Sequence, residues 1–324
     1  MIQIVIDTLG GDNGPSIIVE AVLSFLNKHS DVKITAVGKI VDLKHLEGVC
    51  HIIEATDVVP VEAGPMEVIH MRNSSMMTAI RTLKEEQFDG VISCGSTGGY
   101  LSAATLTLKM IPGIKRAALV SGFPTQVSGK RTVVLDIGAN NENSPEELVQ
   151  FARMGRLYSK AVYALENPKV YLLSNGSEEE KGSPLVKQTH QLLKEANFPN
   201  FMGNIEANTA LNGEADVVVC DGYTGNVFLK TNEGIIKMMG GMIKDMFNKN
   251  AWTKIGYLHV KGEMKKMKES LDYKAVGGAM LLGVNGVVVK AHGNSDAYAF
   301  ENAIELTYKL VKANVIEQIK EGLC

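Results

Sequence analysis

The chain has only four cysteines among its 324 residues, and none of them stands in a CxxC pair or at a cysteine–histidine spacing typical of zinc ligands. This pattern disfavours a structural zinc site and a disulfide framework. Nucleotide fingerprints are missing too, because no GxGxxG motif follows the first apolar strand and no glycine-rich loop ends in Gly-Lys-Ser or Gly-Lys-Thr. We therefore expect no metal, no nucleoside triphosphate and no cofactor.

The chain also lacks an excess of positive charge and a long apolar run. Its 33 lysine and arginine residues are outnumbered by 36 aspartate and glutamate residues, which gives a net charge of −3. A general nucleic-acid binder needs a basic excess, so we expect no nucleic-acid partner. No apolar run approaches the ~18 residues of a membrane-spanning helix, and the start MIQIVIDTLGG has no basic region or cleavage signal. We expect a cytoplasmic protein.

What the sequence contains is a repeated pattern of a short apolar strand, a polar or glycine-rich turn and an amphipathic helix. We expect strands at 2–7, 33–38, 49–54, 90–94, 133–136, 169–173, 201–206, 217–220 and 287–291. Such alternation is typical of an α/β fold with a mostly parallel sheet. The length exceeds the usual size of one hydrophobic core, so residues 1–324 are expected to form one enlarged unit or two lobes.

The stretch 215–230, reading ADVVVCDGYTGNVFLK, shows this pattern most clearly. An apolar run ends in a turn at Asp221 and Gly222, and Gly225 and Asn226 then open the next amphipathic segment. This is the pattern of a buried strand that leads into the N-terminus of a helix, where backbone N–H groups favour anions. We interpret the stretch as part of a binding site for an anionic group.

Other strand ends carry residues that fit the same interpretation. Two carboxylates, Asp7 and Asp12, bracket Gly10 and Gly11 and can orient lysine or backbone groups around a ligand. A glycine-rich loop follows 90–94 and precedes a helix, so its amides can approach a phosphate closely. The remaining candidates at these turns are Ser96, Thr97, Gly98, Asn140, Lys181, His292 and Ser295.

A wide apolar face changes the character of the chain after Asn226. Residues 233–249 repeat methionine and isoleucine at helical spacing, and lysines then surround Met264 and Met267. We predict a helical hairpin over 233–272 that protrudes from the α/β body. We favour a dimer interface over membrane contact for its apolar tip, and its lysines can alternatively receive an acidic protein partner.

Six motifs together resemble the successive signatures of the PlsX phosphate acyltransferases. They are DTLGGDNGP, SMMTAIRTLKEEQFDGVISCGSTGG, VLDIGANNENSPEELVQFARMG, SEEEKG, GNIEANTALNGEADVVVCDGYTGNVFLKTNEG and GGAMLLGVNGVVVKAHGNS. They stand in the order of that family and cover the chain from Asp7 to the last helix. A single glycine-rich loop is weak evidence, but the ordered set is specific.

The resemblance implies transfer of a long-chain acyl group from acyl carrier protein to inorganic phosphate. The product, acyl phosphate, would serve phospholipid synthesis by a downstream glycerol-3-phosphate acyltransferase. The resemblance also implies a homodimer, a three-layer α/β/α fold similar to phosphotransacetylases and isopropylmalate dehydrogenases, and peripheral contact with the inner face of the membrane through the hairpin. The proposed catalytic lysine and asparagine of the family fall on Lys181 and Asn226.

Three departures from the family pattern are visible. Thr8-Leu9 stands where Ala-Met is usual after the first aspartate, and Ser96 stands where asparagine is usual. Asn208-Thr209 replaces a common basic residue followed by aspartate. If that basic residue contacts phosphate or the carrier, this chain is expected to bind more weakly or to prefer another donor.

Direct transfer is the mechanism that these residues favour. Phosphate would bind at helix N-termini, with Lys181 fixing its charge and orientation, and attack the thioester while Asn226 donates to the developing oxyanion. No metal is needed, because phosphate is already a nucleophile and a thiolate leaves readily. The alternative is a covalent route through Cys94 or Cys220, which both end apolar strands and have no histidine partner in the sequence.

Two further hypotheses give the chain another function. A metal-dependent decarboxylating dehydrogenase of related fold needs a carboxylate cluster and a nucleotide pocket; Asp216 and Asp221 are present, but no acidic triad is evident. A non-enzymatic scaffold would bind membrane or carrier protein through the hairpin without turnover. None of these patterns specifies the acyl-chain length or distinguishes acyl carrier protein from coenzyme A as the donor.

Overall fold

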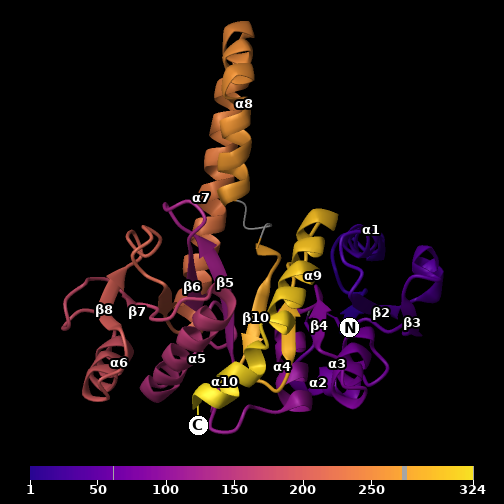
Figure 1. Ribbon diagram of the computed structural model, residues 1–324, viewed down its shortest axis with the longest axis horizontal. Helices are drawn as coiled ribbons and strands as arrows, with labels where there is room; N and C mark the ends of the chain where they lie inside the picture. The colour runs from indigo at the N-terminus through magenta and orange to yellow at the C-terminus, as the bar shows by residue number, and fades with distance from the viewer. Residues whose placement is uncertain (61, 272–275, 324) are drawn as a thin grey trace.

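The computed structural model describes residues 1–60, 62–271 and 276–323 (Figure 1). The strands are β1 (Ile2–Asp7), β2 (Val32–Gly38), β3 (His51–Glu54), β4 (Gly90–Ser93), β5 (Ala118–Pro124), β6 (Arg131–Leu135), β7 (Val170–Ser174), β8 (Phe201–Glu206), β9 (Val217–Val219), β10 (Ala279–Leu282) and β11 (Val287–Lys290). They form one sheet in the order β3-β2-β1-β4-β11-β10-β5-β6-β9-β7-β8.

The helices connect these strands and pack on the sheet. They are α1 (Pro15–Leu26), α2 (Pro65–His70), α3 (Ser75–Glu85), α4 (Thr97–Leu108), α5 (Pro145–Tyr163), α6 (Pro184–Glu195), α7 (Gly222–Asn248), α8 (Ala251–Leu271), α9 (Ala297–Lys312) and α10 (Val315–Leu323), with two short 3-10 turns at Ile40–Asp42 and Lys44–Leu46. Most begin with the signals that the sequence contains. Ser144, for example, caps α5 in a capping box with Glu147, and Pro145 occupies the first turn.

The sheet consists of two parallel halves that run in opposite directions. Strands β3, β2, β1, β4 and β11 are parallel in the first half, and β6, β9, β7 and β8 are parallel in the second. Between them the antiparallel pairs β11–β10, β10–β5 and β5–β6 reverse the direction. The carboxyl ends of the two halves therefore lie at opposite edges of the sheet.

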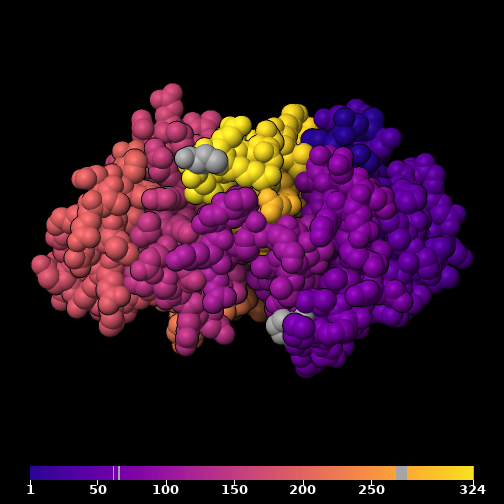
Figure 2. All heavy atoms as spheres, turned by 90° about the horizontal axis from the view of Figure 1, so that it is seen from below, coloured from indigo at the N-terminus to yellow at the C-terminus, as the bar shows by residue number. Residues whose placement is uncertain are grey.

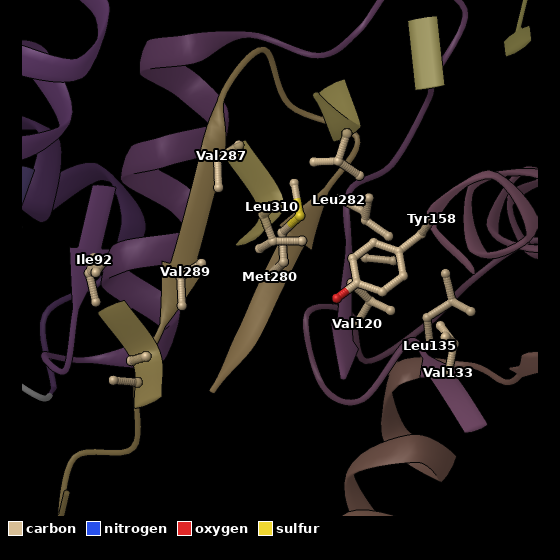
Figure 3. Packing of buried hydrophobic residues seen from close by; sticks show 14 of the residues in the cluster. Ile92, Val120, Val133, Leu135, Tyr158, Met280, Leu282, Val287, Val289 and Leu310 are labelled. Carbon is tan, nitrogen blue, oxygen red and sulfur yellow. The ribbon is translucent and has the colours of Figure 1, made fainter. Parts of the chain in front are cut away.

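Helices cover both faces of the sheet, so the molecule has three layers (Figure 1). One core cluster lies beneath α1, α5, α6, α9 and α10 and includes Val133 and Met280, which Figure 3 shows among its neighbours. The other lies beneath α2, α3, α4 and the start of α7 and includes Val134 and Leu281. Successive residues of a strand thus enter opposite clusters, as expected for strands that are covered on both faces.

The last described segment joins the two halves. Strands β10 and β11 lie between β4 and β5 in the sheet. Helix α9 packs on α1, whereas α10 packs on α5. Figure 2 shows this segment, in yellow, between the N-terminal part and the middle part of the chain.

The predicted hairpin is formed by α7 and α8 and projects far beyond the rest of the molecule (Figure 1). Helix α7 begins at Gly222, so the hairpin continues the helix that carries Asn226. Residue 272, the predicted end of the hairpin, lies outside the described residues. Large apolar side chains stay exposed on the hairpin, and Trp252 is 82% exposed. No helix in the described part of the chain is long and apolar enough to cross a membrane.

The predicted three-layer α/β/α fold with a mostly parallel sheet is confirmed. The sequence analysis identified neither β5 nor β10, the two strands of the antiparallel centre, and it did not predict the reversal between the halves. One continuous sheet runs through both halves. The division of 1–324 into one unit or two lobes, and the role of the hairpin in dimerisation or membrane contact, stay predictions.

Candidate active site

The predicted site residues form two groups at opposite edges of the sheet. The first group follows the carboxyl ends of β1, β4 and β11 and contains Asp7, Gly10, Gly11, Asp12, Ser96, Thr97, Gly98, His292 and Ser295. The second group follows β6, β7 and β9 and contains Asn140, Lys181, Asp221, Gly222, Gly225 and Asn226. A single chain therefore does not bring all of these residues into one pocket.

Asp7 stands at the centre of the first group, beneath the turn that follows β1. Its carboxylate is buried; Ser93 Oγ donates to Oδ2 at 2.6 Å, and Leu9 N donates to Oδ1 at 3.2 Å. Burial raises the pKa of Asp7 to about 6, although hydrogen bonds from Ser75 and Ser93 oppose this shift. Asp7 thus holds the ends of β1 and β4 together.

A buried lysine in the first group escaped the sequence analysis. Lys290 ends β11, its side chain is only 8% exposed, and its Nζ donates to Ala291 O. Burial lowers its pKa to about 8, although Cys94, Asp7 and Asp12 oppose this shift. The signal for Lys290 in the sequence was a lone lysine within the apolar run VVVKA. A strand of this kind is covered on both faces, so its lysine is expected to be buried.

Close backbone contacts join the turns of the first group. Gly10 has a φ of 86°, and a Cβ atom there would lie 3.1 Å from Gly95 Cα, so the turn after β1 rests directly on the turn after β4. Asp12 N donates to Gly293 O at 2.9 Å, which adds the turn after β11. Three loops that are distant in the sequence thus form one surface.

The starts of two helices complete the first group. Ser96 caps α4 by accepting a hydrogen bond from Gly99 N at 3.4 Å, and residues 97–98 are exposed in its first turn. Near the start of α9, Ser295 Oγ donates to His292 O at 2.8 Å. The hydroxyl of Ser295 therefore stabilises the turn after β11.

Asp136, the residue after β6, organises the second group. Its buried carboxylate accepts hydrogen bonds at 2.7 to 3.1 Å from the backbone N–H of Leu119, Gly138, Ala139 and Asn140 and from Asn140 Nδ2. Burial raises its pKa, and these hydrogen bonds oppose the shift. Asn140 Nδ2 also donates to a backbone carbonyl just before β5 at 2.8 Å, so this predicted substrate residue supports the turn. The sequence analysis missed Asp136, although an aspartate directly after an apolar strand was a visible signal.

The start of α7 fits tightly against this turn. Asp221 caps the helix: Oδ1 accepts from Thr224 N at 2.9 Å, and Oδ2 accepts from Thr224 Oγ1 at 2.7 Å. A Cβ atom at Gly222 or Gly225 would lie 2.1 Å or 1.9 Å from a backbone oxygen of the turn after β6. Only glycine permits this approach, so these two glycines fix the place of the first helical turn.

Asn226 and Lys181 both belong to the second group and are both exposed. Asn226 is the fifth residue of α7, and its Cβ is 3.4 Å from the position of a Cβ atom at Gly138. Lys181 lies on the loop between β7 and α6. Because β7 and β9 are parallel neighbours, the loop that carries Lys181 and the helix that carries Asn226 start at the same edge of the sheet.

Helix α7 connects the two groups. Glu233 follows Asn226 by about 10 Å along the helix axis, and its Oε1 lies 3.9 Å from His292 Nε2 in the first group. Burial lowers the pKa of His292, while the Glu233 carboxylate opposes the shift. The same helix therefore carries a candidate catalytic residue at one edge of the sheet and contacts the candidate binding turns at the other.

The described residues contain no compact cluster of metal-binding side chains, and their buried cysteines do not favour covalent thiol chemistry. They contain no group of three histidine, cysteine, aspartate or glutamate side chains that could hold a metal ion, so the cluster needed by a metal-dependent dehydrogenase is not found among them. Burial raises the pKa of Cys94 to about 12 and that of Cys220 well above its usual range, and a raised pKa disfavours the nucleophilic thiolate at both residues. A Cβ atom at Gly11 would lie 2.6 Å from Cys94 Sγ, which shows how closely that sulfur is covered.

Known proteins resemble this chain over almost its whole length. A family described as "Fatty acid synthesis protein" matches residues 2–318. The phosphate acyltransferase of Halothermothrix orenii is 40% identical over 333 residues, covering 99% of this chain and 98% of that protein. The phosphate acyltransferase of Coxiella burnetii is 39% identical over 328 residues, covering 98% and 95%.

Solved structures of lower sequence identity share the fold. A phosphotransacetylase from Streptococcus pyogenes matches with a TM-score of 0.63 at 16% identity, covering 98% of this chain and 94% of that one. A branched-chain phosphotransacylase from Enterococcus faecalis matches with a TM-score of 0.63 at 14% identity, covering 96% and 99%. These matches confirm the predicted likeness of the fold to phosphotransacetylases.

Proposed function

Because the chain belongs to the PlsX family of phosphate acyltransferases, we propose that it transfers a fatty acyl group from the thioester of acyl carrier protein to inorganic phosphate. A phosphate oxygen attacks the carbonyl carbon, the carbon–sulfur bond breaks, and acyl phosphate and the carrier thiolate are released. The observation that carries the proposal is the second group, where Lys181 on a loop and Asn226 near the start of α7 are both exposed after adjacent strands.

The two residues have complementary roles in this reaction. The Lys181 ammonium attracts phosphate and holds it close to the thioester, which lowers the entropic part of the barrier. The Asn226 amide donates to the oxyanion that forms when phosphate attacks. The turn held by Asp136 and the two close glycines keep Asn226 in place before the substrate arrives, as electrostatic stabilisation of a transition state requires.

An acyl phosphate assay tests the proposal. The protein is incubated with phosphate and either palmitoyl acyl carrier protein or palmitoyl coenzyme A, and acyl phosphate is measured by mass spectrometry. Product from the carrier thioester, and its loss in Lys181→Ala, is the expected result. Equal turnover by the wild type and Lys181→Ala would remove Lys181 from the mechanism, and absence of product from both donors would overturn the proposed function.

Direct transfer also predicts that no acyl-enzyme forms. When the protein is exposed to the acyl donor without phosphate, its intact mass is expected to stay unchanged. Cys94→Ala and Cys220→Ala are expected to keep turnover. An adduct with the mass of the acyl group that disappears in either variant would establish the covalent route instead.

We further propose a homodimer in which the second group of one chain faces the first group of its partner. The separation of the two groups within one chain supports this proposal, since Lys181 and His292 lie at opposite edges of one sheet. A complementation experiment tests this arrangement: Lys181→Ala and His292→Ala, each expected to be inactive alone, are mixed under conditions that exchange subunits. Random pairing leaves one intact site in half of the dimers, so recovery of about a quarter of wild-type activity is expected for a twofold dimer. No recovery from exchanged dimers contradicts the shared site and leaves the acyl transfer itself untouched.

We also propose peripheral membrane contact through the hairpin and consumption of the product by a downstream glycerol-3-phosphate acyltransferase. The exposed apolar side chains Met242, Trp252 and Leu258 support a hairpin that buries its tip in another surface. Flotation with phosphatidylglycerol vesicles, with Trp252→Ser and Leu258→Ser as variants, tests the contact. Equal flotation of wild type and variants contradicts it.

A further inference from the structure

Two buried polar residues, one on β8 and one on α6, hold the loop that carries Lys181. Asn204 on β8 is 5% exposed, and His190 on α6 is 7% exposed. Asn204 Nδ2 donates to Glu178 O at 2.8 Å, and the same carbonyl accepts from Lys181 N at 3.1 Å. Asn204 Oδ1 lies 3.0 Å from His190 Nδ1. One carbonyl oxygen thus links the backbone of Lys181 to the sheet.

These contacts settle which nitrogen of His190 carries a proton. Glu178 O can only accept a hydrogen bond, so the group of Asn204 that faces it is the amide NH₂. The amide oxygen of Asn204 must then face His190, and Nδ1 of His190 must be the donor. The His190 ring in turn packs edge-on against Phe201, with the ring centroids 5.0 Å apart. Each polar atom in this chain of contacts therefore has a fixed role.

A second contact holds the same loop. Glu179 Oε1 lies 3.6 Å from His190 Nε2 and also pairs with Lys194 Nζ, and Lys194 lowers the pKa of Glu179. At the end of the loop, Gly182 N donates to Asn175 Oδ1 at 2.9 Å. The backbone before Lys181 is thus attached to both β8 and α6, while the lysine itself extends into solvent.

We propose that His190 and Asn204 are positioning residues that set the place of the Lys181 ammonium. The inference rests on the proposed function, because it assigns them to the acyl transfer through Lys181. His190 orients the Asn204 amide, the amide fixes Glu178 O, and Glu178 O fixes the turn from which the lysine side chain leaves. Neither residue touches substrate. Both residues are buried, and a buried polar pair keeps one arrangement when all of its hydrogen bonds are made. This fixed arrangement is what allows them to position the loop.

A matched pair of substitutions separates this role from a general effect on folding. The amide of asparagine in His190→Asn reaches the position of Nδ1 and can still donate to Asn204 Oδ1. The longer glutamine in His190→Gln places its amide near the position of Nε2 and does not replace that donor. We expect His190→Asn to keep kcat and His190→Gln to lower it by up to about 10²-fold, the cost of a catalytic group displaced by roughly 1 Å. The KM for the thioester is expected to stay unchanged in both variants.

Hydrogen–deuterium exchange gives a readout that does not depend on activity. Residues 175–182 are expected to exchange faster in His190→Gln than in His190→Asn, which loses only the longer 3.6 Å contact with Glu179, and the two variants are expected to melt at equal temperatures. Asn204→Asp is the second test, because its carboxylate keeps the shape but repels Glu178 O; the same faster exchange and the same loss of kcat are expected. Wild-type kcat and exchange in both His190→Gln and Asn204→Asp would overturn the inference. If those two variants are fully active and Lys181→Ala is inactive, the proposed function stands and only the positioning role is lost. If Lys181→Ala is also fully active, Lys181 has no part in the mechanism.

Discussion

Glu233 Oε1 lies 3.9 Å from His292 Nε2. This contact joins helix α7, which follows strand β9 of the second half, to the turn after strand β11 of the first half. Glu233 Oε2 pairs with Lys230 Nζ at 3.2 Å, so the carboxylate is shared between its own helix and the turn after β11. The buried Oε1 atom has no hydrogen bond among the described residues. Protonation of His292 would therefore strengthen its contact with Glu233.

Removing the Glu233 charge is expected to change the titration of His292. In Glu233→Gln the pKa of His292 should fall further below its usual range, because burial continues to disfavour the imidazolium and the opposing carboxylate is gone. Titration of the histidine ring protons by NMR measures this shift, and His29, which pairs with Glu305, serves as the internal control. An unchanged or raised pKa of His292 would contradict the assignment.

Asn226→Ala is expected to lower kcat by about 10²–10³-fold, the usual loss when one oxyanion donor is removed. The fold should not suffer, because the Asn226 side chain is exposed and alanine favours a helix by a few tenths of a kcal/mol relative to asparagine. Steady-state kinetics with the acyl carrier thioester and a thermal melt test the two parts. A loss of activity that follows a loss of melting temperature would point to packing instead of oxyanion stabilisation.

Asp7 is expected to make the stability of the protein depend on pH. Its folded pKa of about 6 exceeds the ordinary 3.8, so the folded state binds more protons than the unfolded state between these values. Its contribution to stability is therefore present below about pH 4 and is lost as the pH rises through about 6. The difference of the two pKa values corresponds to about 3 kcal/mol.

Urea unfolding of the wild type and Asp7→Asn between pH 4 and pH 7.5 measures this contribution. Asparagine keeps the volume but does not titrate, so the free energy of unfolding of the wild type should fall relative to the variant by up to about 3 kcal/mol across this range. Asp7 also raises the pKa of the buried Lys290, so part of the difference between the two proteins comes from Lys290, whose pKa falls further in Asp7→Asn. A difference between the two proteins that is independent of pH would contradict the raised pKa.

Two glycines on the same helix are expected to respond oppositely to alanine. In Gly225→Ala the new Cβ would lie 1.9 Å from Asp136 O, so the first turn of α7 must move and the free energy of unfolding should fall by at least about 2 kcal/mol. In Gly241→Ala the new Cβ meets no atom within 4 Å, and the local helix should gain about 0.5–1 kcal/mol. Urea unfolding and turnover of both variants make the comparison. Equal behaviour would contradict the tight contact at the start of α7.

Much of the fold could be predicted because the parallel strands are short apolar runs that end in glycine or polar turns. Strand β5 escaped because it contains Gly122 and ends at Pro124, two residues that weaken a strand signal. With both β5 and β10 unrecognised, the antiparallel centre and the reversal of the second half could not be seen. The relative direction of two halves depends on pairings between distant segments, which the periodicity within each segment does not report.

The same reversal limited the prediction of the site. Lys181 and Asn226 could be placed together, because each follows a strand of the second half. Their distance from His292 could not be inferred, since the end of a strand looks alike in both halves. Asp136 and Lys290 were missed although each stands at the end of an apolar run, because the sequence does not report which backbone groups a buried charge at such a place contacts.

Helix α7 has a mechanical consequence. Its 27 residues span about 40 Å without interruption, so a tilt of about 10° around its first turn moves its far end by roughly 7 Å. The tip of the hairpin and the Asn226 amide are carried by this one uninterrupted helix. Any surface that fixes the tip also restricts the angle at which that amide is presented.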